Sequence, residues 1–213
     1  MKIMEPGIDL RRYILDTYCV KGDVKSLEFC RKAYDFVMGN DKADTPSTET
    51  HADPIAVDLG LPSGTKWADR NVGAALPEDT GLYFSWGNTD GHEAGKDYEF
   101  DTYDDTPGAE VDGDIDLAHD AARVNLGEPW QMPTKDQFVE LVDNCEIETC
   151  TLNGYRGRRF TSKINGNSIF MPFAGYIYGA GLHDRGSYGY YWSASLNSAA
   201  NGYNLNFNSG GVN

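Results

Sequence analysis

The chain is poor in cysteine and in basic side chains, and it has no long hydrophobic run. Its 213 residues include four cysteines, too few for a disulfide framework at this length. We expect four buried or half-buried thiols, with a Cys145–Cys150 bridge or metal binding as the alternatives. No run of roughly 18 or more apolar residues is present, so we expect no membrane insertion.

Basic residues are outnumbered by acidic ones. Eighteen Lys and Arg residues stand against 33 Asp and Glu residues, which gives a formal net charge of −15. A chain this acidic repels a phosphate backbone and an anionic membrane surface, so no nucleic-acid partner is expected. The first residues lack an apolar signal-peptide core and a small-residue cleavage site. From these residues we expect a cytosolic chain, or one exported by a route that the sequence does not show.

Common catalytic signatures are also missing. The chain contains no Gly-x-Ser-x-Gly nucleophile elbow and no glycine-rich phosphate loop before a helix. The four histidines are scattered without metal-ligand spacing, and we expect them to be solvated or capping residues: His51, His92, His119 and His183. The sequence therefore predicts a protein that is not an enzyme and that needs no cofactor.

Composition divides the chain into three parts. Residues 1–39 predict a helical hairpin, because apolar side chains recur at helical spacing on both sides of Lys21-Gly22-Asp23. Two helices alone bury little surface, so this hairpin should dock on the main domain or act in oligomerisation. Residues 40–54 contain no large apolar group and predict a linker. Residues 55–213 form the predicted main domain.

The main domain has the pattern of an α+β fold. Short apolar runs separated by turn residues predict strands, and helices are expected at residues 117–124 and 135–145. Thr134 and Gln137 have the spacing of a capping box at the start of the second helix. Asn165-Gly166, between Arg159 to Ile164 and Ser168 to Met171, predicts a tight hairpin turn.

An acidic stretch lies between Asp101 and Asp120. Within it, Asp112, Asp114 and Asp116 alternate as carboxylates do in calcium loops. The stretch is not an EF-hand, because Leu117 stands at the position of the turn glycine and Arg123 at that of the bidentate glutamate. Two interpretations remain: a solvated acidic loop, or a structural calcium site at the three alternating aspartates.

The C-terminal segment alternates between apolar and asparagine side chains. Leu205 and Phe207 fall on one strand face, and the intervening asparagines fall on the other. Asparagine is a poor strand former, so folding alone does not explain a row of asparagines on one strand face. Upstream lies an aromatic cluster in which we expect Trp192 to be buried and Tyr188 or Tyr190 to be exposed.

Ordered blocks of sequence between residue 55 and the end resemble one known family. The blocks are Asp58-Leu-Gly-Leu-Pro-Ser-Gly-Thr-Lys-Trp67-Ala-Asp-Arg-Asn71, Pro77 to Trp86, Asp120 to Gly127, Trp130-Gln-Met-Pro-Thr134, Asn167 to Pro172, Gly189 to Ser195 and Tyr203 to Phe207. In this order they resemble the Fibrobacter succinogenes major paralogous domain, which is abundant in Bacteroides-type bacteria and their phages. The resemblance implies a C-type-lectin-like fold related to the formylglycine-generating enzyme group.

The same resemblance implies a function. Some members of the family are variable proteins of diversity-generating retroelements, in which adenine-directed mutagenesis rewrites the codons of a C-terminal segment. Asparagine codons are adenine-rich, so the resemblance predicts a variable ligand-binding surface for a protein or glycan on a cell or virion. The implied ligand-binding residues are Tyr188, Tyr190, Asn197, Asn201, Asn204, Asn206 and Asn208.

Two other functions remain as alternatives. One is a structural surface or phage tail component of the same fold without active diversification. The other is an enzyme of the formylglycine-generating type, which uses late cysteines, whereas no cysteine follows Cys150 here. The chain also stops at Asn213, where relatives continue into a closing strand.

Overall fold

A computed structural model of the chain describes residues 53–94, 113–179, 181–198 and 201–213. The chain divides between Thr50 and His51 into two units, and the described residues all belong to the second. The predicted helical hairpin at residues 1–39 lies outside the described residues, as does the predicted linker apart from Asp53 and Pro54.

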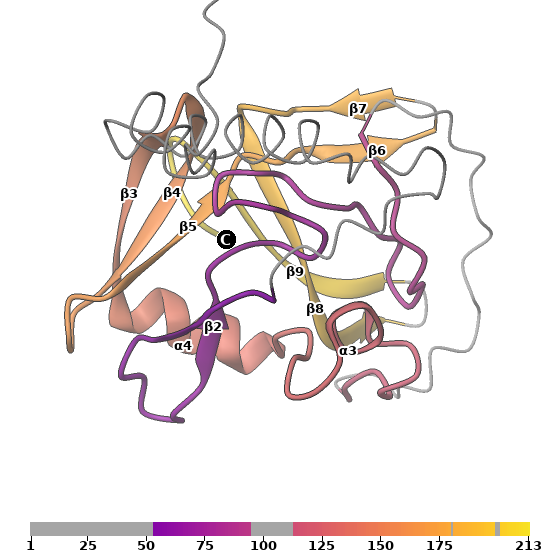
Figure 1. Cartoon of the computed structure of the whole chain (residues 1–213), viewed down its shortest axis with the longest axis horizontal. Helices are drawn as coiled ribbons and strands as arrows, with labels where there is room; N and C mark the ends of the chain where they lie inside the picture. Colours follow the sequence, from indigo (N-terminus) through magenta and orange to yellow (C-terminus); the bar gives the residue numbers. More distant parts are fainter. Residues whose placement is uncertain (1–52, 95–112, 180, 199–200) are drawn as a thin grey trace, which may run out of the picture. The chain divides into compact units, whose positions relative to one another are not determined.

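The described part is a mixed domain that consists mostly of short strands in small antiparallel sheets and has few helices (Figure 1). The strands pair as β1-β2, β3-β4-β5, β6-β7 and β8-β9. The elements are β1 (Ala56–Asp58), β2 (Lys66–Ala68), α3 (Ala121–Leu126), α4 (Lys135–Asn144), β3 (Cys145–Leu152), β4 (Tyr155–Ser162), β5 (Ser168–Pro172), β6 (Tyr176–Tyr178), β7 (Gly181–His183), β8 (Tyr188–Ser198) and β9 (Asn201–Asn208). This confirms the mixed class expected from the sequence.

Helix α4 forms as the sequence predicts. The Thr134 hydroxyl accepts a hydrogen bond from the Gln137 amide at 3.2 Å, and the Gln137 side chain accepts one from the Thr134 amide at 2.9 Å. This reciprocal capping box satisfies two backbone donors that a helix start leaves unpaired. Phe138 and Leu141 are the buried residues of the helix.

Helix α3 begins four residues later than expected. It starts at Ala121 because the Asp120 carboxylate accepts a hydrogen bond from the Arg123 amide at 2.9 Å and so caps the helix. The same carboxylate also accepts from the Met132 amide at 2.9 Å, which ties the cap to the segment before α4. The prediction of a helix from Leu117 was therefore wrong at its start.

Two hairpins build the sheet β3-β4-β5. The predicted β4–β5 hairpin is present, but residues 163–167 connect it, and only Gly166 of the Asn165-Gly166 pair has a positive φ, at 77°. The turn is therefore wider than the predicted tight turn. The β3–β4 hairpin was not predicted, although Asn153-Gly154 joins it with φ values of 46° and 92°, as a two-residue turn requires.

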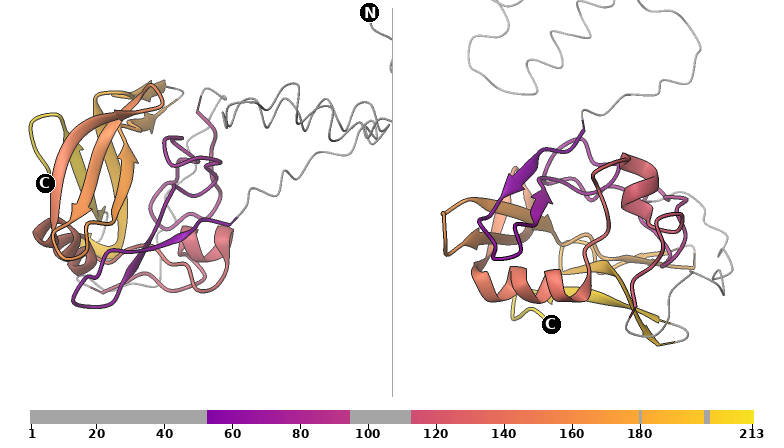
Figure 2. Two further views of the ribbon diagram at one scale, coloured as in Figure 1. Left: turned by 60° about the vertical axis from the view of Figure 1, so that its left-hand side comes forward. Right: turned by 90° about the horizontal axis from the view of Figure 1, so that it is seen from below.

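The main core lies where α4 packs against β3, β4, β8 and β9 (Figure 2). Phe207 is at its centre, with its ring 6.0 Å from the ring of Phe160 and 5.9 Å from that of Phe173. Trp67 of β2 joins the same core by packing on Phe138, with ring centroids 5.6 Å apart. The last strand is thus anchored by aromatic packing from several elements.

Among the described residues, no helix has the length and apolar character needed to cross a membrane.

Replacing Thr134 with alanine should lower the free energy of unfolding by about 1 kcal/mol, because one amide of the first turn loses its cap. Val139→Ala on the same helix is the matched control, since Val139 is 52% exposed and its loss should change stability by less than about 0.5 kcal/mol. Urea unfolding followed by circular dichroism measures both. Equal stability of the two variants would contradict the role of the capping box.

Candidate functional site

The β8–β9 hairpin presents aromatic and asparagine side chains on a single face. Its antiparallel register places Tyr188 opposite Asn208, Tyr190 opposite Asn206, and Trp192 opposite Asn204. Cross-strand partners share one face of a sheet. The opposite face carries Leu205 and Phe207, which are 4% and 1% exposed. The alternation predicted from the sequence is confirmed.

The three asparagines of β9 that lie opposite the aromatic residues of β8 differ in their contacts. Asn204 is exposed, whereas Asn206 and Asn208 are half-buried. The Asn208 side chain accepts a hydrogen bond from the Gly210 amide at 2.7 Å and so shapes the turn after β9. Asn206 pairs through its backbone with Asn213, at 3.0 and 2.8 Å, so the end of the chain lies along the second edge of β9. Asn204 is therefore the member least engaged in the fold.

Asn197 and Asn201 lie at the far end of the hairpin. Both are exposed, as expected. The register is irregular between Trp192 and Leu196 and again before Ser198, so the regular alternation does not extend to these two asparagines. The structure thus groups five of the seven predicted residues in regular register and places Asn197 and Asn201 beyond the irregularity.

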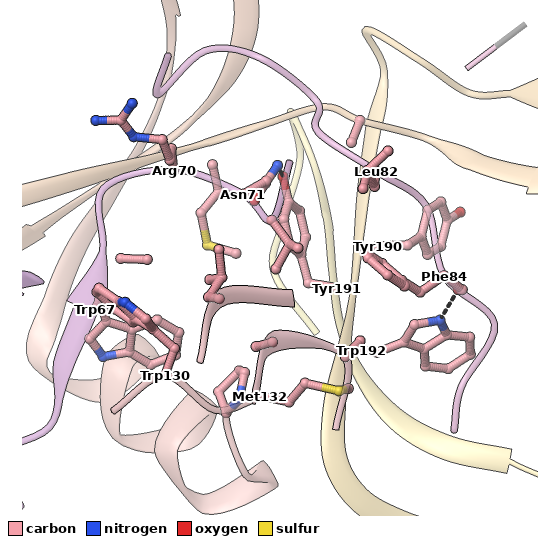
Figure 3. Close-up of a pocket in the computed structure, with 18 of the residues that line it drawn as sticks. Trp67, Arg70, Asn71, Leu82, Phe84, Trp130, Met132, Tyr190, Tyr191 and Trp192 are labelled. Carbon is pink, nitrogen blue, oxygen red and sulfur yellow. Dashed lines mark hydrogen bonds between the residues drawn. The ribbon is translucent and has the colours of Figure 1, made fainter. Parts of the chain in front are cut away.

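The expectation that Trp192 is buried was wrong. The residue is 37% exposed, and its indole nitrogen donates a hydrogen bond to the Phe84 carbonyl at 2.9 Å (Figure 3). The physical reason is strand periodicity, because residue 192 falls on the same face as residues 188 and 190. The inward position belongs to Tyr191, whose ring stacks on Phe207 with centroids 5.5 Å apart.

Tyr191 is fixed at both ends of its side chain. Its hydroxyl donates to the Pro172 carbonyl at 2.8 Å and accepts a 3.4 Å hydrogen bond from the Asn71 amide. Burial raises the pKa of Tyr191 far above its ordinary value, so the phenol stays neutral. Tyr191 is therefore part of the support beneath the exposed face.

The aromatic face extends onto the β6–β7 hairpin, which the sequence analysis did not include in the site. A bridge between Gly175 and Gly189 places the start of β6 beside the start of β8. The Tyr176 ring lies 5.2 Å from the Tyr190 ring and 5.3 Å from the His183 ring. The available signal was the alternation Tyr176-Ile177-Tyr178, but no local pattern shows that β6 adjoins β8.

A pocket of about 860 Å³ lies between the segment of residues 65–92 and strands β5 and β8 (Figure 3). Aromatic side chains such as those of Trp67, Phe84 and Trp130 line its walls together with aliphatic and polar ones, and the buried indole nitrogen of Trp67 has no hydrogen-bond partner among the described residues. The volume is in the range of small-molecule sites. Tyr176, Tyr190, Trp192 and Asn204 line both this pocket and the exposed face.

The acidic stretch is engaged in local hydrogen bonds where it is described. Asp114 accepts a 2.6 Å hydrogen bond from the Ser195 hydroxyl, and Asp116 lies 2.8 Å from the Nδ1 atom of His119. The hydrogen bond from His119 lowers the pKa of Asp116. Asp112 lies outside the described residues, and within the described ranges no three acidic, histidine or cysteine side chains are grouped as metal ligands are.

Cys145 and Cys150 are free thiols, so the alternative of a bridge between them was wrong. They sit five residues apart along the single strand β3, and their partners across the ladder are Ser162 and Gly157. Cys145 packs in the main core, and this burial raises the pKa of its thiol.

No family model, curated protein or solved structure matches this chain. The family resemblance therefore rests on the sequence blocks themselves.

Leu205→Ala should lower the free energy of unfolding by about 2–5 kcal/mol, because it opens a cavity beneath the hairpin. Its neighbour provides the control: Asn204→Ser should change stability by less than about 0.5 kcal/mol, since the Asn204 side chain is exposed. Thermal and urea unfolding compare the two. A large loss for Asn204→Ser would mean that the asparagine belongs to an internal polar network.

Structural calcium at Asp112, Asp114 and Asp116 stays a prediction. A cation that binds only the native state raises the melting temperature. Calcium should therefore raise the melting temperature of the wild type relative to a chelator, and Asp114→Asn should abolish the shift. Asp143→Asn, an exposed carboxylate on α4, is the control that should keep it. An unchanged melting temperature of the wild type would contradict the site.

Proposed function

We propose that this chain is a non-enzymatic ligand-binding protein that displays an exchangeable binding surface on a C-type-lectin-like scaffold. One observation carries the proposal: the face formed by β8 and β9 puts Tyr188, Tyr190 and Trp192 opposite three asparagines. Leu205 and Phe207, which anchor β9 in the core, point the other way. Recognition and folding therefore depend on different side chains of the same two strands.

This separation is what an exchangeable surface requires. Leu205 and Phe207 contribute buried apolar area, which is the dominant favourable term in folding. The Asn204 side chain contributes little to the core, so substitution there should change recognition with little effect on the fold. A rigid scaffold with variable polar and aromatic residues on one face is the arrangement that adaptable binding proteins use.

The composition of the face supports binding over catalysis. Tyrosine and tryptophan offer large contact areas with little conformational entropy to lose, and asparagine both donates and accepts hydrogen bonds. The resemblance to the Fibrobacter succinogenes major paralogous domain adds the source of variation, adenine-directed mutagenesis of a C-terminal segment. The proposed partner is a protein or glycan on a cell or virion surface.

A cell-binding assay tests this function. Labelled protein is incubated with intact Bacteroides-type cells and with their phage particles, and bound label is counted by flow cytometry and by sedimentation. Replacing Asn204, Asn206 and Asn208 together with alanine should reduce binding by about tenfold or more. The matched control replaces Thr149 and Thr151, two exposed polar residues of β3, with alanine.

Wild-type binding that the asparagine variant retains in full would contradict the proposal. Circular dichroism of each variant shows that any loss of binding is not a loss of fold.

The neighbouring DNA tests the proposed diversification. A reverse transcriptase gene and a near-identical repeat of the C-terminal coding segment should lie nearby, and the two copies should differ at adenines of the repeat. The differences should fall in the codons of exposed residues such as Asn204, and not in those of Leu205 and Phe207. Absence of both genetic elements would favour a structural surface or phage tail component without diversification.

A further inference from the structure

Four strands contribute to one continuous row of side chains. Across the β6–β7 ladder, His183 is paired with Tyr176, and their rings are stacked with centroids 5.3 Å apart. Tyr176 lies edge-on to Tyr190 of β8 at 5.2 Å, and Tyr190 is paired with Asn206 of β9. The Asn213 side chain closes the row by donating to Asn206 at 3.4 Å. We call these five residues the cross-strand row.

Exposed aromatic rings flank the cross-strand row on both sides. Tyr178, two residues after Tyr176 on the same face, is 69% exposed and lies opposite Gly181. On β8, Tyr188 and Trp192 are 36% and 37% exposed, and the Tyr188 ring stacks on Tyr190 at 5.9 Å. A soluble protein rarely exposes contiguous aromatic surface of this kind without a ligand for it.

The cross-strand row has no Asp, Glu, Lys or Arg side chain. Its members are phenol, imidazole and amide groups, and the nearest charged residues in sequence, Asp184 and Arg185, have opposite signs. A charged group on a bound ligand would lose hydration here without gaining a partner of opposite charge, and this loss costs free energy. An acidic ligand would in addition be repelled by a chain with a net charge of −15. The charge pattern therefore disfavours an acidic ligand.

A neutral carbohydrate chain matches this combination of groups. Each sugar unit has an apolar C–H surface that can lie against an aromatic ring, and a rim of hydroxyl groups that both donate and accept hydrogen bonds. The rings of Tyr176, Tyr178 and Tyr190 offer the first kind of contact. The amides of Asn204 and Asn206 offer both hydrogen-bonding functions beside those rings.

We propose that the cross-strand row, with Tyr178, is a calcium-independent binding site for a neutral oligosaccharide. This inference rests on the proposed ligand-binding function and specifies its ligand class. It also divides the site into two parts. Tyr176, Tyr178 and His183 lie before the C-terminal segment and form a constant part, whereas the asparagines of β9 form the part that selects among sugars.

Isothermal titration calorimetry in EDTA tests the proposal. The probes are maltohexaose, cellohexaose, xylohexaose, mannohexaose and laminarihexaose, with hexagalacturonate as the acidic counterpart. At least one neutral hexasaccharide should bind, and hexagalacturonate should not. Tyr178→Ala should weaken the binding by about tenfold or more. Tyr155→Ala is the matched control, because Tyr155 is a tyrosine 41% exposed at the β3–β4 turn, and it should bind within about twofold of the wild type.

A second variant separates packing from recognition. Tyr176→Phe keeps the ring and should retain most of the binding, whereas Tyr176→Ala should lose about tenfold. Circular dichroism confirms that each variant is folded. The proposal is overturned if no neutral hexasaccharide binds, if hexagalacturonate binds instead, if EDTA abolishes binding, or if Tyr178→Ala binds like the wild type.

The cell-binding assay distinguishes a failure of the oligosaccharide inference from a failure of the proposed ligand-binding function. If the asparagine variant loses cell binding while Tyr178→Ala keeps it, the C-terminal surface binds another ligand, such as a protein, and only the oligosaccharide inference fails. If neither variant changes cell binding, both proposals fail. If both variants lose cell binding and a neutral hexasaccharide competes for it, both stand.

Discussion

The burial of Phe207 is the constraint on which the β8–β9 hairpin depends. Its ring is surrounded by Phe160, Phe173 and Tyr191, and its cross-strand partner is Gly189. A side-chain carbon at position 189 would collide with the Phe207 ring, so glycine is required there for the two strands to approach. Because side chains alternate along a strand, one buried residue in this position decides which face every neighbour occupies.

Other contacts hold the two ends of the hairpin. At one end the buried Arg158 guanidinium donates to the Asn208 carbonyl at 2.9 and 2.6 Å. At the other, Gly202 packs against the indole of Trp86, which donates a buried 2.7 Å hydrogen bond to the Ser193 carbonyl. All of these contacts come from backbone atoms or from the inner side of the strands. The outer face therefore takes no part in these contacts, although Trp192 on it still donates to the Phe84 carbonyl and Asn208 on it accepts from the Gly210 amide. This is the face that we propose for recognition.

Several features of the domain could be read from local sequence. The Thr134 capping box, the presence of the β4–β5 hairpin and the alternation of Leu205 and Phe207 with asparagine depend on residues close together in the chain. The same kind of signal is present at Asn153-Gly154, which joins β3 and β4. Strand periodicity likewise places Trp192 outward and Tyr191 inward, so the expectation of a buried Trp192 disagrees with the register of its own strand.

By itself, the sequence determined the mixed class, the start of α4 and the side of β9 that carries asparagine, because each follows from periodicity or capping within a few residues. Only the tertiary structure decided that β6 lies beside β8, which brings Tyr176 against Tyr190. It also decided that Asp120 caps α3 while contacting the segment before α4, and that a pocket lies between residues 65–92 and the strands. These features depend on contacts between elements far apart in the chain, and packing selects such contacts without leaving a local pattern.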